Sequence, residues 1–220
     1  MTIDKKEKKV IVFDLGGVIL PLCHDTMLRQ FKLLNPRIDD SVIMSFYTNE
    51  LTQHFEVGGM TKQDYLQYLQ QHYFKGIQLP RITKAITCFL GSVSRKSIHV
   101  LEKIRLLCDD LCLLSNTNPI HVDAYEENFF LQHRLLPCDL FDYVFYSYEM
   151  GLRKPDPAIY QHVLEICQCC PENVLFIDDN KENIAAARLM GIKTIHYPHN
   201  EPLDDDFYSS IQQQWSLLVD

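Results

Sequence analysis

The chain has no long hydrophobic run, which argues against a helical membrane protein. No stretch approaches the roughly 20 apolar residues that a helix needs to cross a bilayer. The first apolar run, at residues 10–13, is four residues long and ends at Asp14, so we expect no signal peptide and a cytoplasmic protein. Internal repeats and low-complexity linkers are also lacking. The length of 220 residues therefore suits one ordinary domain or a core that carries an inserted subdomain.

Positive charge is scarce as well. The formal net charge of −8 argues against nucleic acid and against an anionic membrane surface as partners. The eight cysteines are scattered, and without a secretion signal they are typical of reduced, mostly buried thiols. Cys167, Cys169 and Cys170 cluster, but no matching His/Cys pair occurs elsewhere, which favours packing over a zinc site.

Nucleotide-binding glycine motifs are missing too. Gly16 and Gly17 fit neither the dinucleotide-binding spacing nor the P-loop spacing, so we exclude both. The composition, with 46% hydrophobic and 23% charged residues, is otherwise close to that of an average globular protein.

Three short segments share one pattern, in which four apolar residues precede a polar one. They are residues 10–13 before Asp14, residues 111–114 before Ser115, and residues 174–177 before Asp178. Such continuous apolar runs are typical of strands that are buried on both faces in a parallel sheet. Residues 192–197 and 143–146 are two further strand candidates.

Helical patterns lie between these strands. Asp156, followed by a proline, predicts the start of one helix. The apolar stripe of this helix comprises Ile159, Val163, Ile166 and Cys167. Asn180 is suited to cap the next helix and Gly191 to end it. Alternating strands and helices predict an α/β fold with a doubly wound parallel sheet.

The segment from about Asp25 to Phe89 breaks this alternation and has the pattern of several consecutive helices. A helical block inserted after the first strand predicts a cap over the carboxyl edge of the sheet. We therefore expect residues 1–22 and 92–220 to form the α/β core and residues 23–91 to form the helical cap.

Polar residues at the ends of three predicted strands form the candidate site. In an open α/β sheet, ligands bind beyond the carboxyl ends of the strands, so Asp14, Ser115 and the Asp178–Asp179 pair should meet in one crevice. Singly, Ser115 has an ordinary alternative role as a helix cap, and Lys154 as a surface lysine. Two adjacent carboxylates at a buried strand end, however, require a cation.

These segments resemble the four motifs of the haloacid dehalogenase (HAD) superfamily. The motif-like segments are Phe-Asp-Leu-Gly-Gly-Val at residues 13–18, Leu-Ser-Asn-Thr-Asn at 114–118, Gly-Leu-Arg-Lys-Pro-Asp at 151–156 and Phe-Ile-Asp-Asp-Asn at 176–180. The subgroup most similar is that of bacterial sugar-phosphate phosphatases of the α-D-glucose-1-phosphate phosphatase type. The resemblance covers the core, whereas in the cap it is limited to residues 55–58 and the residues just after them.

The resemblance implies a magnesium-dependent phosphatase that acts on small phosphorylated metabolites, plausibly sugar phosphates. Asp14 would be the nucleophile and would form an aspartyl-phosphate. The oxygen ligands of Mg²⁺ would be Asp14, the backbone carbonyl of Gly16, and one or both of Asp178 and Asp179.

The remaining residues of the site would bind the phosphoryl group. Ser115 and the backbone amide of Asn116 would hold phosphate oxygens. Lys154 would supply the fixed positive charge that the transition state requires.

One position departs from the pattern of this superfamily. Most of its phosphatases carry a second Asp two residues after the nucleophile as general acid and base, and here that residue is Gly16. Without a proton donor, the reaction should depend steeply on the leaving group. The candidate substitutes are His24, Asp25, His54 and Glu56.

Two other interpretations remain open from the sequence. A dehalogenase of the same superfamily needs no general acid, which suits Gly16, but the Asp178–Asp179 pair suggests a metal that such an enzyme does not need. A non-catalytic relative that binds phosphometabolites or a protein partner is the second. The sequence identifies neither the substrate nor the oligomeric state.

Overall fold

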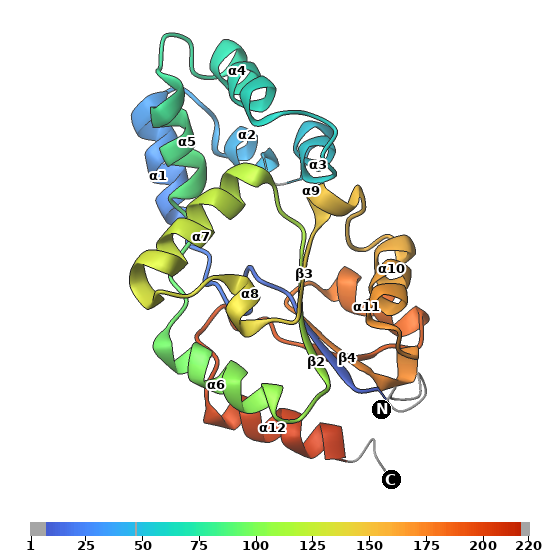
Figure 1. Cartoon of the computed structure of the whole chain (residues 1–220). Helices are drawn as coiled ribbons and strands as arrows, with labels where there is room; N and C mark the ends of the chain where they lie inside the picture. Colours follow the sequence, from blue (N-terminus) through green and yellow to red (C-terminus); the bar gives the residue numbers. More distant parts are fainter. Residues whose placement is uncertain (1–7, 47, 217–220) are drawn as a thin grey trace.

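A five-stranded parallel sheet forms the centre of the molecule (Figure 1). The computed structural model describes residues 8–46 and 48–216. The strand order is β3-β2-β1-β4-β5, and all four neighbouring pairs are parallel. The strands are β1 (Val10–Phe13), β2 (Asp110–Ser115), β3 (Tyr143–Tyr146), β4 (Val174–Asp178) and β5 (Lys193–His196). The doubly wound α/β fold and the five expected strand positions are therefore confirmed.

Side chains of the three central strands alternate between two apolar layers, as the pleat of a strand requires. Ile11 and Phe13 of β1 face a layer covered by α6 (Arg95–Arg105), α7 (Pro119–His133) and α12 (Asp205–Ser216). Val10 and Val12 face the opposite layer, under α10 (Pro157–Cys167) and α11 (Lys181–Leu189). Both faces of the sheet are thus buried, which explains the unbroken apolar runs in the sequence.

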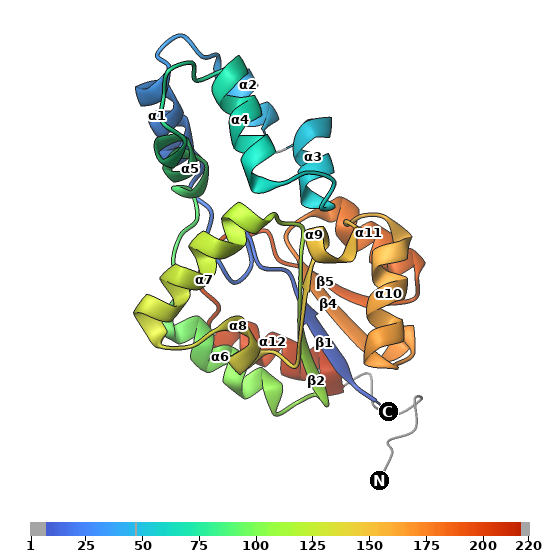
Figure 2. The ribbon, with the colours of Figure 1, turned by 45° about the horizontal axis from the view of Figure 1, so that its top comes forward.

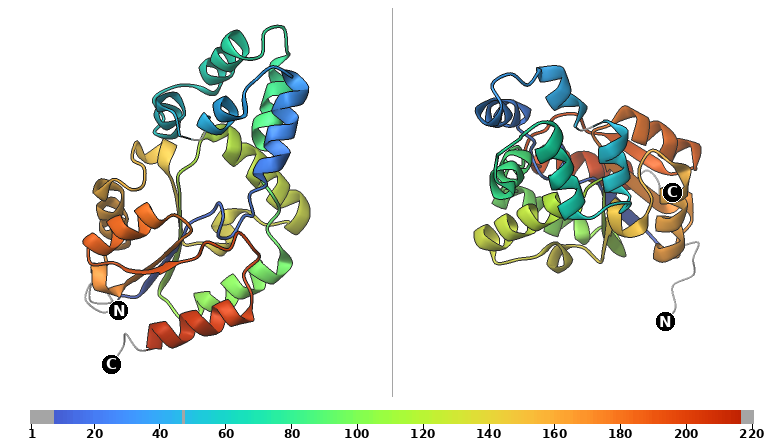
Figure 3. Two further views of the ribbon diagram at one scale, coloured as in Figure 1. Left: turned by 180° about the vertical axis from the view of Figure 1, so that it is seen from behind. Right: turned by 90° about the horizontal axis from the view of Figure 1, so that it is seen from above.

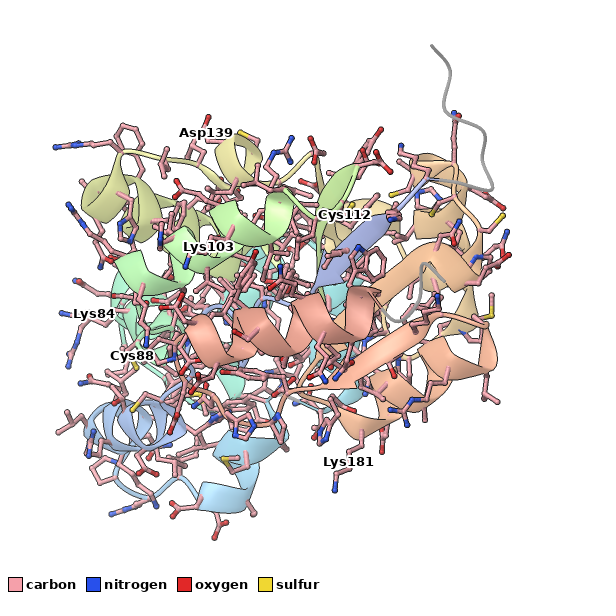
Figure 4. The ribbon with its side chains drawn as sticks, turned by 90° about the horizontal axis from the view of Figure 1, so that it is seen from below. Lys84, Cys88, Lys103, Cys112, Asp139 and Lys181 are labelled. Carbon is pink, nitrogen blue, oxygen red and sulfur yellow. The ribbon has the colours of Figure 1, made fainter. Side chains whose placement is uncertain are left out.

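Helix α12 packs against α6 and completes the first layer. Figure 4 shows the two helices side by side from below, with Lys103 labelled on α6. The Nζ of Lys103 lies 2.7 Å from Oδ1 of Asp205, at the start of α12. Helix α12 is therefore held by this ion pair and by its apolar residues Phe207, Ile211 and Trp215, which are buried in the layer.

Helix α10 begins as expected, because the side chain of Asp156 accepts a hydrogen bond from the backbone N–H of Ala158 and a proline occupies the first turn. Its apolar stripe was predicted wrongly at one position. Ile166 is 42% exposed, whereas Tyr160 and Leu164 are buried against the sheet. On a helix of 3.6 residues per turn, position 166 lies about 20° outside the arc from 159 to 164 that faces the sheet.

Helices α1 to α5 form a separate block beyond the carboxyl ends of the strands (Figure 2). They are α1 (His24–Leu34), α2 (Asp40–Ser45), α3 (Glu50–Glu56), α4 (Lys62–His72) and α5 (Leu79–Thr87). The block has its own apolar cluster, in which Phe31 stacks on Phe74 with 5.3 Å between ring centroids. Seen from above, the block lies in front of the α/β part (Figure 3).

Two chain segments that run side by side connect this block to the sheet. Leu22 and Leu90 form an antiparallel bridge, and the backbone N–H of Cys23 donates to the carbonyl of Phe89 over 2.8 Å. The side chain of Asn200 pairs with both the N–H and the carbonyl of Leu22, at 2.8 and 2.9 Å. The connection is therefore anchored to the loop after β5.

Three short elements complete the part of the chain that the structure describes: α8 (Pro137–Leu140), α9 (Ser147–Met150) and a 3₁₀ turn at Pro171–Asn173. Within the described part of the chain, no helix has both the length and the apolar character that crossing a bilayer requires.

Candidate active site

Three carboxylates meet where β1 and β4 end. The strands are paired so that Phe13 is opposite Ile177, and the N–H of Asp14 donates to the carbonyl of Ile177 over 2.8 Å. The carboxylate oxygens of Asp14, Asp178 and Asp179 consequently lie within 4.8 Å of one another. Parallel register thus brings together residues that lie far apart in the chain.

Lys154 is the cation at the centre of this cluster. It is 1% exposed, and its Nζ lies 2.8 Å from Oδ1 of Asp14 and 2.7 Å from Oδ2 of Asp178. A third hydrogen bond runs from Nζ to the carbonyl of Leu114, at 2.9 Å. Burial opposes the charged ammonium, but the attraction of the two carboxylates outweighs it and raises the pKa of Lys154. The lysine is therefore charged at neutral pH.

One lysine does not neutralise three carboxylates. Burial raises the pKa of Asp14, Lys154 lowers it, and repulsion from Asp178 raises it again, with a raised pKa as the result. Burial and Asp178 likewise raise the pKa of Asp179. A buried site with excess negative charge and oxygen donors has the chemistry that suits a hard divalent cation, so these residues fit Mg²⁺.

Asp178 and Asp179 differ in what surrounds them. Asp178 is fully buried, and besides Lys154 its oxygens accept hydrogen bonds from the N–H of Asn180 at 2.8 Å and the side chain of Asn183 at 3.1 Å. The Asp179 carboxylate is less buried and faces Gly17. Both carboxylate oxygens of Asp178 thus accept hydrogen bonds from protein groups, whereas the Asp179 side chain lines the cavity.

The loop after β2 is fixed to the loop that carries Lys154. The side chain of Asn116 donates to the carbonyl of Lys154 and accepts from its N–H, each at 2.8 Å. Ser147, fully buried at the start of α9, holds the next residue by accepting from the N–H of Thr117 and donating to its carbonyl. Ser115 does not cap α7, because Asn118 caps it instead.

A cavity of about 240 Å³ opens over the cluster, between the sheet and the helical block. Six of the seven residues predicted from the sequence line it: Asp14, Gly16, Ser115, Asn116, Lys154 and Asp179. Asp178 is not among the lining residues, but it contacts Lys154, which does line the cavity. Leu22, Phe89 and Leu90 from the connecting segments form part of the wall.

Of the four candidate proton donors, only Glu56 lines the cavity. Asp25 is exposed on α1, and the ring of His24 lies beside Phe89, with 6.0 Å between centroids. The ring of His54 lies directly over Gly59.

Sequence reasoning missed several residues of the site. Arg153 also lines the cavity and pairs with Glu56, with Nη2 3.2 Å from Oε2. Asn183, Ser147 and His121 were not identified either. Asn183 had a detectable signal, because the side chain of the third residue after a helix cap can reach back beyond the start of the helix, as that of Asn183 does to Asp178. The other three belong to long-range contacts without a local pattern.

The chain is similar to several known proteins. D-ribitol-5-phosphate phosphatase from Bacteroides thetaiotaomicron is 26% identical over 193 residues, which cover 87% of this chain and 92% of that protein. A crystal structure of a HAD family enzyme from the same species, in complex with magnesium and inorganic phosphate, has a TM-score of 0.78 and 28% identity, and the match covers 86% of this chain and 93% of that one.

A further structure, of a HAD-like family hydrolase from Porphyromonas gingivalis, has a TM-score of 0.80 and 27% identity over 94% of this chain and 97% of the other. The haloacid dehalogenase-like hydrolase family matches residues 8–191, which include four of the five strands, the cavity and the helical block. The chain therefore belongs to the haloacid dehalogenase-like hydrolase family.

Proposed function

We propose that this hydrolase is a magnesium-dependent phosphatase of small phosphorylated metabolites, with the Asp14 carboxylate as its nucleophile. The observation that carries the proposal is the pairing of Asp14 with the buried Lys154 on the floor of a cavity that also holds Asp179. Two similarities support the proposal: one relative is D-ribitol-5-phosphate phosphatase, and a similar enzyme was crystallised with magnesium and inorganic phosphate.

Each group would act as phosphoryl transfer requires. A carboxylate oxygen of Asp14 attacks phosphorus while the bond to the leaving oxygen breaks, and an aspartyl-phosphate forms that water then hydrolyses. Lys154 stabilises the negative charge that spreads over the phosphoryl oxygens. Ser115 and the backbone amide of Asn116 line the same cavity and would hold those oxygens. The pairing of Asn116 with Lys154 keeps the two loops at a fixed separation.

Magnesium would be held by Asp14, the carbonyl of Gly16 and Asp179. Asp179 is the better direct ligand of the acidic pair, because the oxygens of Asp178 already accept hydrogen bonds from Lys154 and from Asn180 and Asn183. The metal would supply charge neutralisation between the nucleophile and the anionic substrate.

Residues 23–91 would act as the cap and residues 1–22 and 92–220 as the catalytic core. This division rests on the separate apolar cluster of α1 to α5 and on the paired connections at Leu22 and Leu90; residues 1–7 and 217–220 lie outside the described part of the chain. The cap would enclose a small substrate such as a sugar phosphate. The cytoplasmic location stays a prediction.

The test is turnover of 4-nitrophenyl phosphate with and without Mg²⁺. We expect activity that chelation with EDTA abolishes and that added Mg²⁺ restores. Activity toward a haloacid in excess EDTA would instead support a dehalogenase. Absence of turnover for a broad set of phosphate monoesters, with Mg²⁺ present and the chain folded, would support a non-catalytic relative.

A further inference from the structure

The proposed phosphatase reaction needs a proton for the leaving group, and the residues assigned so far do not supply it. The assignment of a proton donor rests on that proposed function. When Asp14 displaces an alcohol from phosphorus, the departing oxygen needs a proton. Position 16 provides none, and space there is limited, because a Cβ on Gly16 would lie 3.2 Å from Cδ1 of Leu22. The donor must therefore come from another wall of the cavity.

Few ionisable side chains line that cavity besides Asp14, Lys154 and Asp179, which the mechanism already uses. The single ring proton of neutral His121 is already used in a hydrogen bond. Nε2 donates it to the carbonyl of Ile86 at 3.1 Å, and Nδ1 accepts from the side-chain amide of Asn118 at 3.1 Å. Burial lowers the pKa of His121 to about 4, so the ring is neutral at pH 7. A neutral imidazole in this arrangement has no acidic proton to give.

Among the described residues, two other ionisable groups remain on the wall besides Glu56. Burial raises the pKa of the Tyr125 phenol far above its ordinary value, which makes it a weak acid. A guanidinium does not act as an acid in proteins, which excludes the arginine on this wall. Glu56 is left, and it is a carboxyl group on the cap side of the cavity, opposite the strand ends.

Arg153 binds one carboxyl oxygen of Glu56 and leaves the other oxygen available to a substrate. Its side chain is 13% exposed, and Oε2 accepts from Nη2 of Arg153 at 3.2 Å. Among residues 8–46 and 48–216, no group forms a hydrogen bond with Oε1. Burial raises the pKa of Glu56 despite the opposing effects of Arg153 and Lys154. The phenol of Tyr65 is also close enough for the negative charge of Glu56 to raise its pKa.

The backbone around Glu56 is fixed against the core. Gly58 has φ +74°, and a Cβ there would lie 2.4 Å from the carbonyl oxygen of Tyr148, so this turn packs closely on α9. On the other side, Phe55 is fully buried and stacks on Tyr65 with 4.4 Å between centroids. These contacts fix the backbone on both sides of Glu56, and Arg153 holds its carboxyl group, so the side chain is positioned as a general acid requires.

We propose that Glu56, supplied by the helical block, is the general acid and base that replaces the missing aspartate at position 16. In the first step, an oxygen of Asp14 bonds to phosphorus, the bond from phosphorus to the leaving oxygen breaks, and that oxygen takes the proton of Glu56. In the second step, a water oxygen attacks phosphorus, the bond to Asp14 breaks, and the water proton returns to Glu56.

Charge in the cavity favours this cycle. A substrate phosphate brings negative charge beside Glu56 and so promotes its protonation before the first step. After that step Glu56 is a carboxylate, and its partner Arg153 stabilises it until water arrives. The pair thus supports both protonation states that the two steps need.

The experiment compares wild type with Glu56→Gln on phosphate monoesters that span a wide range of leaving-group pKa. The amide keeps the shape of the side chain and an oxygen for Arg153 but has no acidic proton. In wild type, log(kcat/KM) should fall only slightly as the leaving-group pKa rises. In Glu56→Gln, kcat/KM should drop about 10²–10⁴-fold for primary alkyl phosphates and stay within about tenfold for 4-nitrophenyl phosphate, whose leaving group needs no proton.

Two controls make the result specific. Glu50→Gln, an exposed carboxylate on the same helix, should leave the wild-type slope unchanged. With 4-nitrophenyl phosphate, Glu56→Gln should also accumulate the aspartyl-phosphate, because the second step has lost its base.

An equal loss on all substrates would overturn the assignment, because it would mean that Glu56 serves only to position the cap. A steep slope already present in wild type would overturn it as well, and this outcome needs no variant to fold. Lack of wild-type turnover on every phosphate ester would instead count against the proposed function itself.

Discussion

The backbone of Gly17 packs so closely against the side chain of Asp179 that only glycine fits at position 17. A Cβ built on Gly17 would lie 2.4 Å from Oδ2 of Asp179, and the φ of Gly17 is +76°, in the left-handed region. The first turn after β1 therefore sets the position of an acidic side chain at the end of β4.

Gly17→Ala should consequently displace Asp179. We expect kcat/KM for phosphate esters to fall at least about tenfold, with a loss of about 1–3 kcal/mol in unfolding free energy from the strained backbone. Gly76→Ala is the matched control, since Gly76 has φ +79° with no atom within 4 Å of its virtual Cβ. It should lose similar stability and keep full activity. Full activity in Gly17→Ala would show that Asp179 need not remain where it lies.

The two acidic residues at the end of β4 should respond differently to neutralisation. Asp179→Asn removes a proposed metal ligand and should weaken Mg²⁺ binding at least about tenfold, as measured by calorimetry on the free protein, because even indirect partners of a metal contribute that much. Asp178→Asn breaks a fully buried ion pair with Lys154 and should lower the unfolding free energy by about 3 kcal/mol.

The expected pattern is therefore a metal defect in Asp179→Asn and a stability defect in Asp178→Asn. The reverse pattern would make Asp178 the direct ligand. Equal Mg²⁺ affinity in wild type and both variants would exclude the acidic pair from the metal site.

The buried His121 should make stability depend on pH. Its pKa of about 4 in the folded state is below the ordinary value of 6.5, so between these values the unfolded chain binds more protons. Lowering the pH from 7 to 5 should therefore destabilise the protein through this residue, by about 1–2 kcal/mol. Urea unfolding of wild type and His121→Gln at both pH values measures the difference. An identical pH dependence in the two proteins would mean that His121 is accessible to protons in the folded state.

The sheet and the floor of the site were predictable because short-range rules determine them. Residues 10–13, 111–114 and 174–177 are apolar without interruption because both faces of their strands are covered. Asp14, Ser115 and Asp178 lie at the ends of those strands, and parallel pairing requires them to share one edge.

The wall that the helical block α1 to α5 contributes to the site was not predictable in the same way. Glu56 and Arg153 are 97 positions apart, and their contact depends on how α3 packs against α9, which no local pattern specifies. Glu56 appeared in the sequence only as one of four possible proton donors. Ile166 shows the same limitation on a smaller scale, because periodicity identifies the apolar side of α10 but not the edge of the arc that the sheet covers.

The covalent role of Asp14 is the central claim, and trapping of the phosphoenzyme tests it most directly. Wild type is mixed with a phosphate ester and Mg²⁺, quenched in acid within a turnover, digested with trypsin and analysed by mass spectrometry. We predict a hydroxylamine-labile phosphoryl group on Asp14, within the peptide of residues 10–29. Asp14→Asn should show neither label nor turnover while unfolding like wild type. Label on another residue, or phosphate release by Asp14→Asn at the wild-type rate, would contradict the account.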